Sequence, residues 1–203
     1  MVTPITCTIA RKLKFKLLYF TIIALSFIFF AGQSYSQTSY KIVSSSHIKV
    51  SGTSNLHDWT MVAENFNCEG NFVLKGGALQ DVSSLSFVLP VTNLKSKESL
   101  MNTRTYKALK SETYPKITFK LTSATVLPQS KTIKATGNLT IAGVTNVVSL
   151  LSNYTVNADE SITCKGSEVI NMTNYKIKAP SFMLGALKVG EKVTIDILLK
   201  LKK

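Results

Sequence analysis

The stretch EKVTIDILLKLK, residues 191–202, alternates apolar and polar side chains over its whole length. An extended chain turns successive side chains to opposite faces, so a period of two predicts a strand with one apolar face. Here that face holds Val193, Ile195, Ile197 and Leu199. The stretch therefore predicts a β-strand that covers a hydrophobic core with one of its sides.

Further stretches of this kind follow one another along the chain and are separated by turn-forming residues. They are residues 40–51, 56–74, 85–94, 116–127, 131–143, 144–156 and 162–171, of which 56–74 holds one or two strands. About eight strands in one domain predict an all-β fold, either an antiparallel barrel or a sandwich. We favour the barrel, because closure leaves no exposed sheet edge.

Residues 97–115 depart from the alternation and are rich in helix formers. Met101 and Leu109 supply apolar side chains, and Tyr106 lies five residues after Met101, close to the same side. The residue before Pro115 is driven out of helical geometry, which would end the helix there. We expect a short helical crossover between two strands.

The first 36 residues have the three parts of a secretory signal peptide. A basic flank at residues 11–16 precedes the apolar run 17–31, and the small residues Ser34 and Ser36 stand at −3 and −1 to a cleavage site. The alternative is a membrane anchor, but this run is shorter than the roughly 20 residues of a spanning helix. We expect export to the periplasm and a mature chain, residues 37–203, that forms one domain.

The mature chain is basic, and nearly all of its positive charge comes from lysine. The chain has 24 Lys and Arg, and without the four in the signal segment 20 remain against 11 Asp and Glu, a net charge of +9. Such a surface suits phosphates, acidic glycans or the anionic headgroups of a membrane surface. Export argues against nucleic acid as the partner. The alternative is a scattered, solvated lysine surface without a specific partner.

Two cysteines of the mature chain, Cys68 and Cys164, lie far apart in the sequence. In an oxidising compartment they can form a disulfide if the fold brings them together. The alternative is a pair of buried thiols that act as small apolar side chains. The sequence leaves both open.

The stretch SNLHDWTM, residues 54–61, places His57, Asp58 and the single tryptophan, Trp59, side by side. In a strand His57 and Asp58 would face opposite sides, which disfavours a catalytic dyad, and no activated nucleophile accompanies them. Neither the two histidines nor the two cysteines have the close spacing of a metal site. We therefore expect no catalytic residue, no metal and no cofactor, with Trp59 packed in the core or over one end of the barrel.

Several stretches of the mature chain resemble the YceI-like family of bacterial lipid- and polyisoprenoid-binding proteins. They are LKSKESLMNTRTYKALKSETYPKITFKLTSATV (94–126), GNLTIAGVTNVVSL (137–150) and GEKVTIDILLKL (190–201), with SGTSNLHDWT (51–60) and MTNYKIKAPSFMLGALKVG (172–190) resembling a subset of members. Together they span roughly residues 40–202. The His57-Asp58-Trp59 stretch departs from the best-known family pattern, and this end of the barrel would shape the mouth of the pocket.

The resemblance implies an extended, eight-stranded, lipocalin-like barrel that holds an isoprenoid or other long-chain lipid, and it implies frequent homodimers. The expected lining is the inward face of the strands, with a lid from the crossover and from the loop that contains Phe182, Met183 and Leu184. The lining residues are Phe66, Leu85, Phe87, Leu89, Met101, Tyr106, Ile117, Phe119, Leu121, Leu139, Ile141, Phe182, Val193, Ile195 and Ile197. A headgroup phosphate would meet Arg104, Lys107 or Lys110.

Two other functions remain open at this point. A barrel filled by its own side chains would be an interaction module of the cell envelope, without a cavity or a lipid. A hydrolase or isomerase would use His57 in turnover. The leading hypothesis is a non-enzymatic periplasmic carrier for an amphiphilic lipid.

Overall fold

The computed structural model describes residues 38–182 and 186–203. Its strands are β1 (Thr38–Ile42), β2 (His47–Ser54), β3 (Trp59–Ala63), β4 (Asn67–Lys75), β5 (Ala78–Pro90), β6 (Lys116–Leu127), β7 (Thr132–Ile141), β8 (Val144–Val156), β9 (Ile162–Asn171), β10 (Ser181–Phe182) and β11 (Leu187–Lys202). The helix α2 (Ser99–Ala108) and the 3₁₀ helices η1 (Val91–Asn93) and η2 (Met172–Tyr175) complete the fold. The predicted signal segment, residues 1–36, lies outside the described residues.

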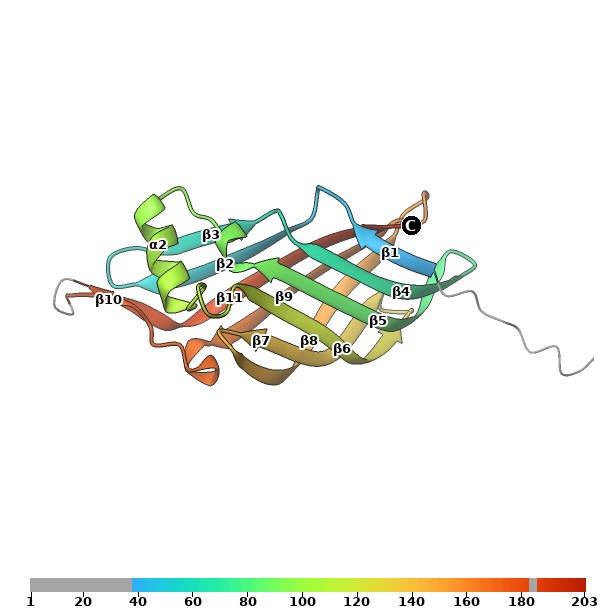
Figure 1. Ribbon diagram of the computed structural model, residues 1–203. Coiled ribbons are helices and arrows are strands. Elements are labelled where there is room, and N and C mark those ends of the chain that lie inside the picture. Colours follow the sequence, from blue (N-terminus) through green and yellow to red (C-terminus); the bar gives the residue numbers. More distant parts are fainter. Residues whose placement is uncertain (1–37, 183–185) are drawn as a thin grey trace, which may run out of the picture. The chain divides into compact units, whose positions relative to one another are not determined.

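The strands form one closed antiparallel barrel (Figure 1). Neighbouring strands pair in the order β1, β4, β5, β6, β7, β8, β9 and β11, and β1 pairs with β11 to close the ring. The hairpin of β2 and β3 continues the wall, because β2 pairs with the first part of β11 while β1 pairs with its end. The predicted eight-stranded antiparallel barrel with a short helical crossover is confirmed.

The predicted strand 40–51 is interrupted, and the buried Ser46 explains the break. The Ser46 hydroxyl donates to the carbonyl oxygen of Lys200 (3.2 Å) and accepts from its backbone N–H (2.9 Å). This side chain thus takes the place of a backbone partner of β11 while the chain turns between β1 and β2. The stretch 56–74 likewise forms two strands, β3 and β4.

Two strands are longer than the sequence predicts, and an additional short strand is present. β5 begins at Ala78, before the predicted residue 85, because Gly76 and Gly77 both have positive φ (58° and 76°) and make a two-residue hairpin with β4. β11 begins at Leu187, where it pairs with β10. The β10 strand was not predicted.

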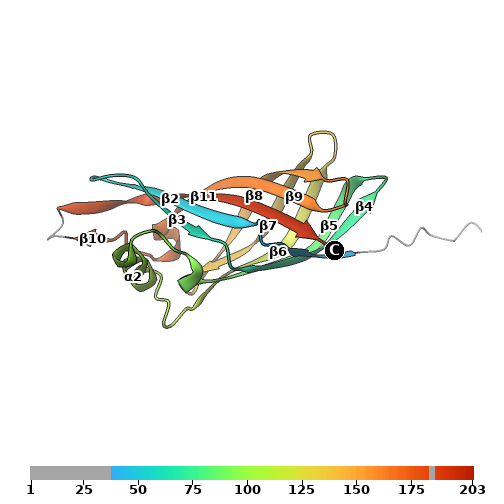
Figure 2. The same cartoon turned by 90° about the horizontal axis from the view of Figure 1, so that it is seen from above.

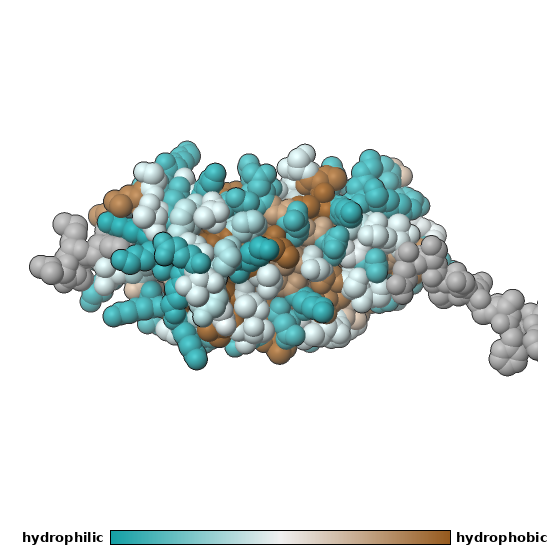
Figure 3. Space-filling model, viewed as in Figure 1, coloured by the Kyte–Doolittle hydropathy of each residue, from teal (hydrophilic) through white to brown (hydrophobic). Residues whose placement is uncertain are grey.

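The barrel is closed at one end and covered by the crossover at the other. Tyr40, Leu79, Ile162 and Leu201 are fully buried, and the ring of Tyr40 packs edge-on against Phe72 at 5.4 Å. These residues plug the end where the C-terminus lies, whereas α2 and β10 lie at the opposite end (Figure 2). The face seen in Figure 3 is mixed: hydrophilic and near-neutral side chains surround smaller hydrophobic patches. No helix of the described part of the chain is long and apolar enough to cross a bilayer.

The β7–β8 turn gives a test of local packing. Gly143 has φ +79°, and a Cβ there would lie 2.4 Å from the ring of Tyr114. We expect Gly143→Ala to lower the free energy of unfolding by about 1–3 kcal/mol, since strain and overlap act together. Gly76→Ala is the matched control, because its φ is +58° and no atom lies within 4 Å of the added Cβ. Urea unfolding of both variants measures the difference, and equal losses would contradict the Tyr114 contact.

Candidate functional site

Two adjoining cavities occupy the interior of the barrel. The outer cavity has a volume of about 360 Å³ and the inner cavity one of about 170 Å³. The two cavities adjoin, because six apolar residues line both of them: Val50, Leu94, Ile117, Ile141, Ile170 and Ile195. A space of this size and lining is typical of a small-molecule site.

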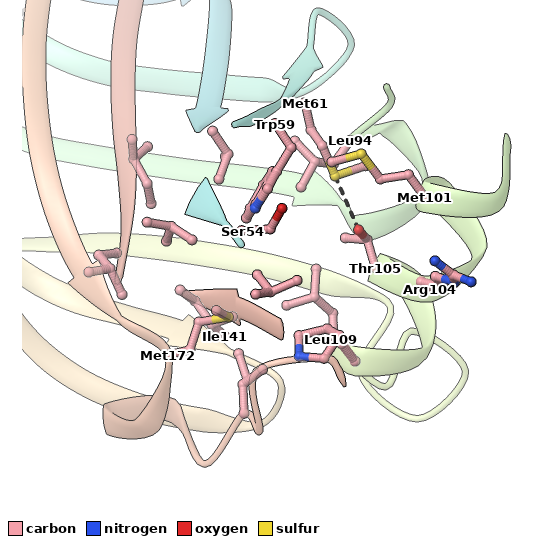
Figure 4. A pocket seen from close by; sticks show the side chains of 18 of the residues that line it. Ser54, Trp59, Met61, Leu94, Met101, Arg104, Thr105, Leu109, Ile141 and Met172 are labelled. Carbon is pink, nitrogen blue, oxygen red and sulfur yellow. Dashed lines mark hydrogen bonds between the residues drawn. The ribbon is translucent and has the colours of Figure 1, made fainter. Parts of the chain in front are cut away.

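Trp59 forms part of the wall of the outer cavity because Gly52 leaves room for its ring. Trp59 starts β3, pairs with Gly52 of β2, and donates its indole N–H to the carbonyl oxygen of Thr53 (3.2 Å). A Cβ at Gly52 would lie 2.3 Å from the indole ring. The ring therefore lies flat over the backbone of β2 and points toward Ile141 across the cavity (Figure 4).

The turn before Trp59 forms one rim of the outer cavity. The Ser54 hydroxyl accepts from the backbone N–H groups of Leu56 (3.2 Å) and His57 (3.1 Å) and donates to the carbonyl oxygen of His57 (2.7 Å). Asn55 fixes the turn to the start of β11, because it accepts from the N–H of Lys188 (2.9 Å). Leu56 and His57 are thereby held at the rim, exposed to solvent.

The helix α2 covers the outer cavity without being buried itself. No residue of α2 is buried, while Met101 and the following Leu109 pack against the core. The Thr105 hydroxyl donates to the sulfur of Met61 at 3.2 Å (Figure 4). Few buried contacts hold this helix, so it is the part of the wall best suited to move when a ligand enters.

Tyr106 does not line the cavity, contrary to the prediction. Its hydroxyl lies beside two carbonyl oxygens, those of Thr92 (2.9 Å) and Leu94 (3.1 Å). At about 100° per residue, five residues turn a helix by about 500°, so Tyr106 faces away from the side of Met101. It anchors α2 to η1.

Polar residues also line the outer cavity. Ser54, His57, Glu98, Arg104 and Thr105 are half-buried or exposed and form its mouth, whereas Tyr175 is buried. Of the three predicted headgroup residues only Arg104 is part of this lining; Lys107 and Lys110 lie on the crossover away from it. The cavity therefore combines an apolar body with a polar mouth, as an amphiphilic ligand requires.

The inner cavity contains both cysteines as free, buried thiols. Burial raises the pKa of Cys68 to about 12, with a further rise from the neighbouring Cys164, and burial also raises the pKa of Cys164 to about 12. Both thiols are protonated at neutral pH and are poor nucleophiles. Of the two alternatives left open by the sequence, the structure contains the thiol pair.

Most of the predicted lining residues do line the two cavities. They are Leu85, Phe87, Leu89, Met101, Ile117, Phe119, Leu121, Leu139, Ile141, Val193, Ile195 and Ile197. Phe66 is buried beside the lining and packs on Phe87 with ring centroids 5.3 Å apart. The side chain of Phe182, and Met183 and Leu184, lie outside the described residues.

Several cavity residues were missed because they lie in turns or on weakly patterned strands. Tyr175 and Ile177 come from the η2 turn, where Asn171 accepts from the N–H of Thr173 (3.1 Å) and Lys176 adopts a positive φ. Met61 and Met172 also line the outer cavity. The alternation in 162–171 would have identified Ile170; the turn residues carry no periodic signal.

In the described part of the chain, His57 and Asp58 do not form a catalytic dyad. The Nδ1 atom of His57 lies 2.8 Å from the backbone oxygen of Asp58, and no hydrogen bond joins the ring to the carboxylate in residues 38–182. No group of three His, Cys, Asp or Glu side chains that could hold a metal occurs in the described part of the chain. His57 belongs to the rim of the cavity.

Comparison with solved structures finds the same fold in several proteins. A polyisoprenoid binding domain from Saccharophagus degradans, implicated in plant cell wall breakdown, has a TM-score of 0.64 at 13% identity, covering 82% of this chain and 99% of that one. BcnA of Burkholderia cenocepacia has a TM-score of 0.60 at 17% identity, covering 75% and 95%. The YCEI protein of Campylobacter jejuni has a TM-score of 0.54 at 16% identity, covering 68% and 84%.

Comparison with curated protein sequences found no match. The family model of the YceI-like domain matches residues 29–201, which include all of the barrel strands except the last residue of β11. The match agrees with the barrel, its helical crossover and the stretches on which the resemblance rests. The chain belongs to the YceI-like domain family.

Proposed function

We propose that this protein is a non-enzymatic binding and carrier protein for an amphiphilic lipid with a long apolar chain, a polyisoprenoid above all. The observation that carries the proposal is the pair of adjoining apolar cavities that lie between a polar mouth and a plugged end. A long apolar chain can fill this space, and a polar headgroup can stay at the mouth beside His57, Glu98 or Arg104.

Burial of apolar surface supplies the binding free energy of such a ligand, at roughly 25 cal/mol per Å². The relative from Saccharophagus degradans, described as a polyisoprenoid binding domain, supports the choice of ligand class. A barrel with a solid core predicts no cavity, and the two cavities argue against that alternative. The signal-like segment 1–36 supports export to the periplasm.

The ligand can be identified by mass spectrometry on an organic extract of the protein, purified from its own cells after natural export. We expect one long-chain isoprenoid or quinone lipid per chain, and an intact mass that corresponds to residues 37–203. Folded protein that yields a clean extract and takes up no added lipid would contradict the carrier function. An intact mass that includes residues 1–36 would contradict cleavage and export.

Trp59 provides a direct binding assay because it is the only tryptophan and lines the outer cavity. A quinone with a short isoprenoid tail, such as ubiquinone-2, should quench its fluorescence in a saturable way when it occupies the cavity.

A further inference from the structure

The wall of the barrel contains a seam between β8 and β9. These strands pair only over Ser152–Val156 and Ile162–Gly166, and in the described chain no pair joins the rest of β8 to the rest of β9. Over this unpaired part each strand keeps its other neighbour: β7 pairs with β8 up to Val144, and β11 pairs with β9 up to Asn171. The two strands thus diverge while the sheets on either side stay intact.

The seam is bounded at both ends. At one end Gly166 permits the last close pair, since a Cβ there would lie 2.9 Å from the carbonyl oxygen of Leu151. At the other end the side-chain amide of Asn146 donates to the carbonyl oxygen of Asn174 in the η2 turn (2.9 Å). The seam therefore consists of residues 147–151 of β8 and 167–171 of β9.

The inner cavity extends to this seam. Its lining includes residues from both edges, among them Leu151 and Ser167, whose side chains are exposed on the outside of the barrel. The other strands contribute only inward-facing residues to this lining. The lining by outward-facing residues indicates that the space between the two edges joins the interior to the surface.

Exposed apolar side chains gather along the same edges. Val147 is 71% exposed, Leu151 59% and Val169 58%. Single apolar residues on a surface are ordinary, but these three flank one opening into an apolar cavity. They provide a favourable surface for an apolar chain that passes between the strands.

Glu168 lies on the inward face of β9 at the seam. It pairs with the inward-facing Ile195 of β11 and lines the inner cavity. Gly166 and Ile170, two residues away on the same face of β9, line it as well. Burial raises the pKa of Tyr175, which lines the outer cavity, and the charge of Glu168 adds to that rise. A carboxylate among apolar side chains needs water, so its position is consistent with solvent access through the seam.

The plugged end of the barrel makes a side opening useful. Tyr40, Leu79, Ile162 and Leu201 are fully buried at that end, so a chain that enters only by the mouth must thread lengthwise toward a plugged end. A lateral opening lets the chain enter sideways and lets displaced water leave.

We propose that the seam between β8 and β9 is a lateral opening through which the apolar chain of the ligand enters and leaves the inner cavity. This inference rests on the proposed lipid-binding function and adds the route that the ligand takes. The ligand class that fits this route is a flexible, unbranched or methyl-branched hydrocarbon chain.

A reversible cross-link across the seam tests the proposal. If the register of the last pair continued, Ser149 would lie opposite Val169, and both side chains are exposed. We would make Ser149→Cys with Val169→Cys, fold the protein, and join the new thiols with a short bis-methanethiosulfonate linker. Buried Cys68 and Cys164, with their high pKa values, will react slowly with the reagent.

Stopped-flow quenching of Trp59 by ubiquinone-2 then measures the rate of uptake. We expect the cross-linked protein to take up the quinone about tenfold more slowly, and reduction of the linker to restore the rate. The matched control joins Ser149→Cys to Thr136→Cys of β7, whose native hydroxyls are 3.3 Å apart in a regular ladder. This control cross-link should leave the rate unchanged.

Each outcome decides between the two proposals. Equal uptake rates with the seam closed and open, in protein that binds the quinone, overturn the lateral opening and leave the lipid-binding function standing. Absence of saturable quenching before cross-linking overturns both. An equal slowing by the control cross-link also overturns the lateral opening, because closure of the seam would then not be the cause.

Discussion

Replacement of Ile141 with glutamate is expected to abolish lipid retention. Ile141 is 7% exposed, ends β7 and lines both cavities, so it lies where the two spaces join. A carboxylate there would have to lose its water against the ligand chain without a charged partner, which costs several kcal/mol. We expect the dissociation constant for ubiquinone-2 to rise at least about 100-fold, or about 2.7 kcal/mol, in the Trp59 quenching assay.

The matched control is Leu127→Glu. Leu127 ends β6, is 48% exposed and lines neither cavity, so the same change of charge should leave binding unaltered. Circular dichroism and urea unfolding establish that each variant is folded. Should Ile141→Glu fail to fold, Ile195→Glu offers a half-buried position that also lines both cavities. Folded variants that bind as tightly as the unchanged protein would show that the barrel interior is not the binding site.

The sequence predicts the inward face of the barrel well because a period of two is a local property. Val193, Ile195 and Ile197 could be assigned to one face from their spacing alone, and all three line the cavities. The helical crossover could also be predicted, because helix-forming residues are likewise a local property. The direction of Tyr106 on that helix follows only when about 100° per residue is applied strictly.

Features that depend on distant residues could not be predicted. Ser46 looks like its neighbours Ser44 and Ser45, and only its contacts with Lys200 explain the break between β1 and β2. The seam depends on where β8 and β9 stop pairing, which is a relation between strands. Glu168 therefore appears in the sequence as one polar residue in a strand and only in the structure as the charged group at an opening.

The stability of the protein should fall steeply in alkaline solution because of its two buried thiols. Cys68 and Cys164 have pKa values of about 12 in the folded protein, against an ordinary value of 9.0. The unfolded chain therefore loses these protons first as the pH rises. The stabilisation is fully present below pH 9 and is lost progressively as the pH approaches 12.

A pH of 10.5 lies about 1.5 units above the pKa of a thiol in the unfolded chain. The free energy of unfolding therefore falls by about 2 kcal/mol for each cysteine. We expect urea unfolding to give a free energy about 4 kcal/mol lower at pH 10.5 than at pH 8 from this source. Buried tyrosines contribute a separate loss, since burial raises the pKa of Tyr40, Tyr154 and Tyr175. The double variant Cys68→Ala with Cys164→Ala keeps the tyrosine contribution, so the difference between the two proteins isolates the thiols.

The same measurement distinguishes free thiols from a disulfide between Cys68 and Cys164. A disulfide has no proton to lose, so the unchanged protein and the double variant would then show the same pH dependence. Counting thiols with a chromogenic disulfide reagent in denaturant gives an independent readout, with two thiols expected from Cys68 and Cys164 and none from them if they are bonded to each other. Equal pH dependence together with two free thiols would instead show that the cysteines are less buried than the inner cavity requires, because desolvation is the largest cause of the raised pKa of each thiol.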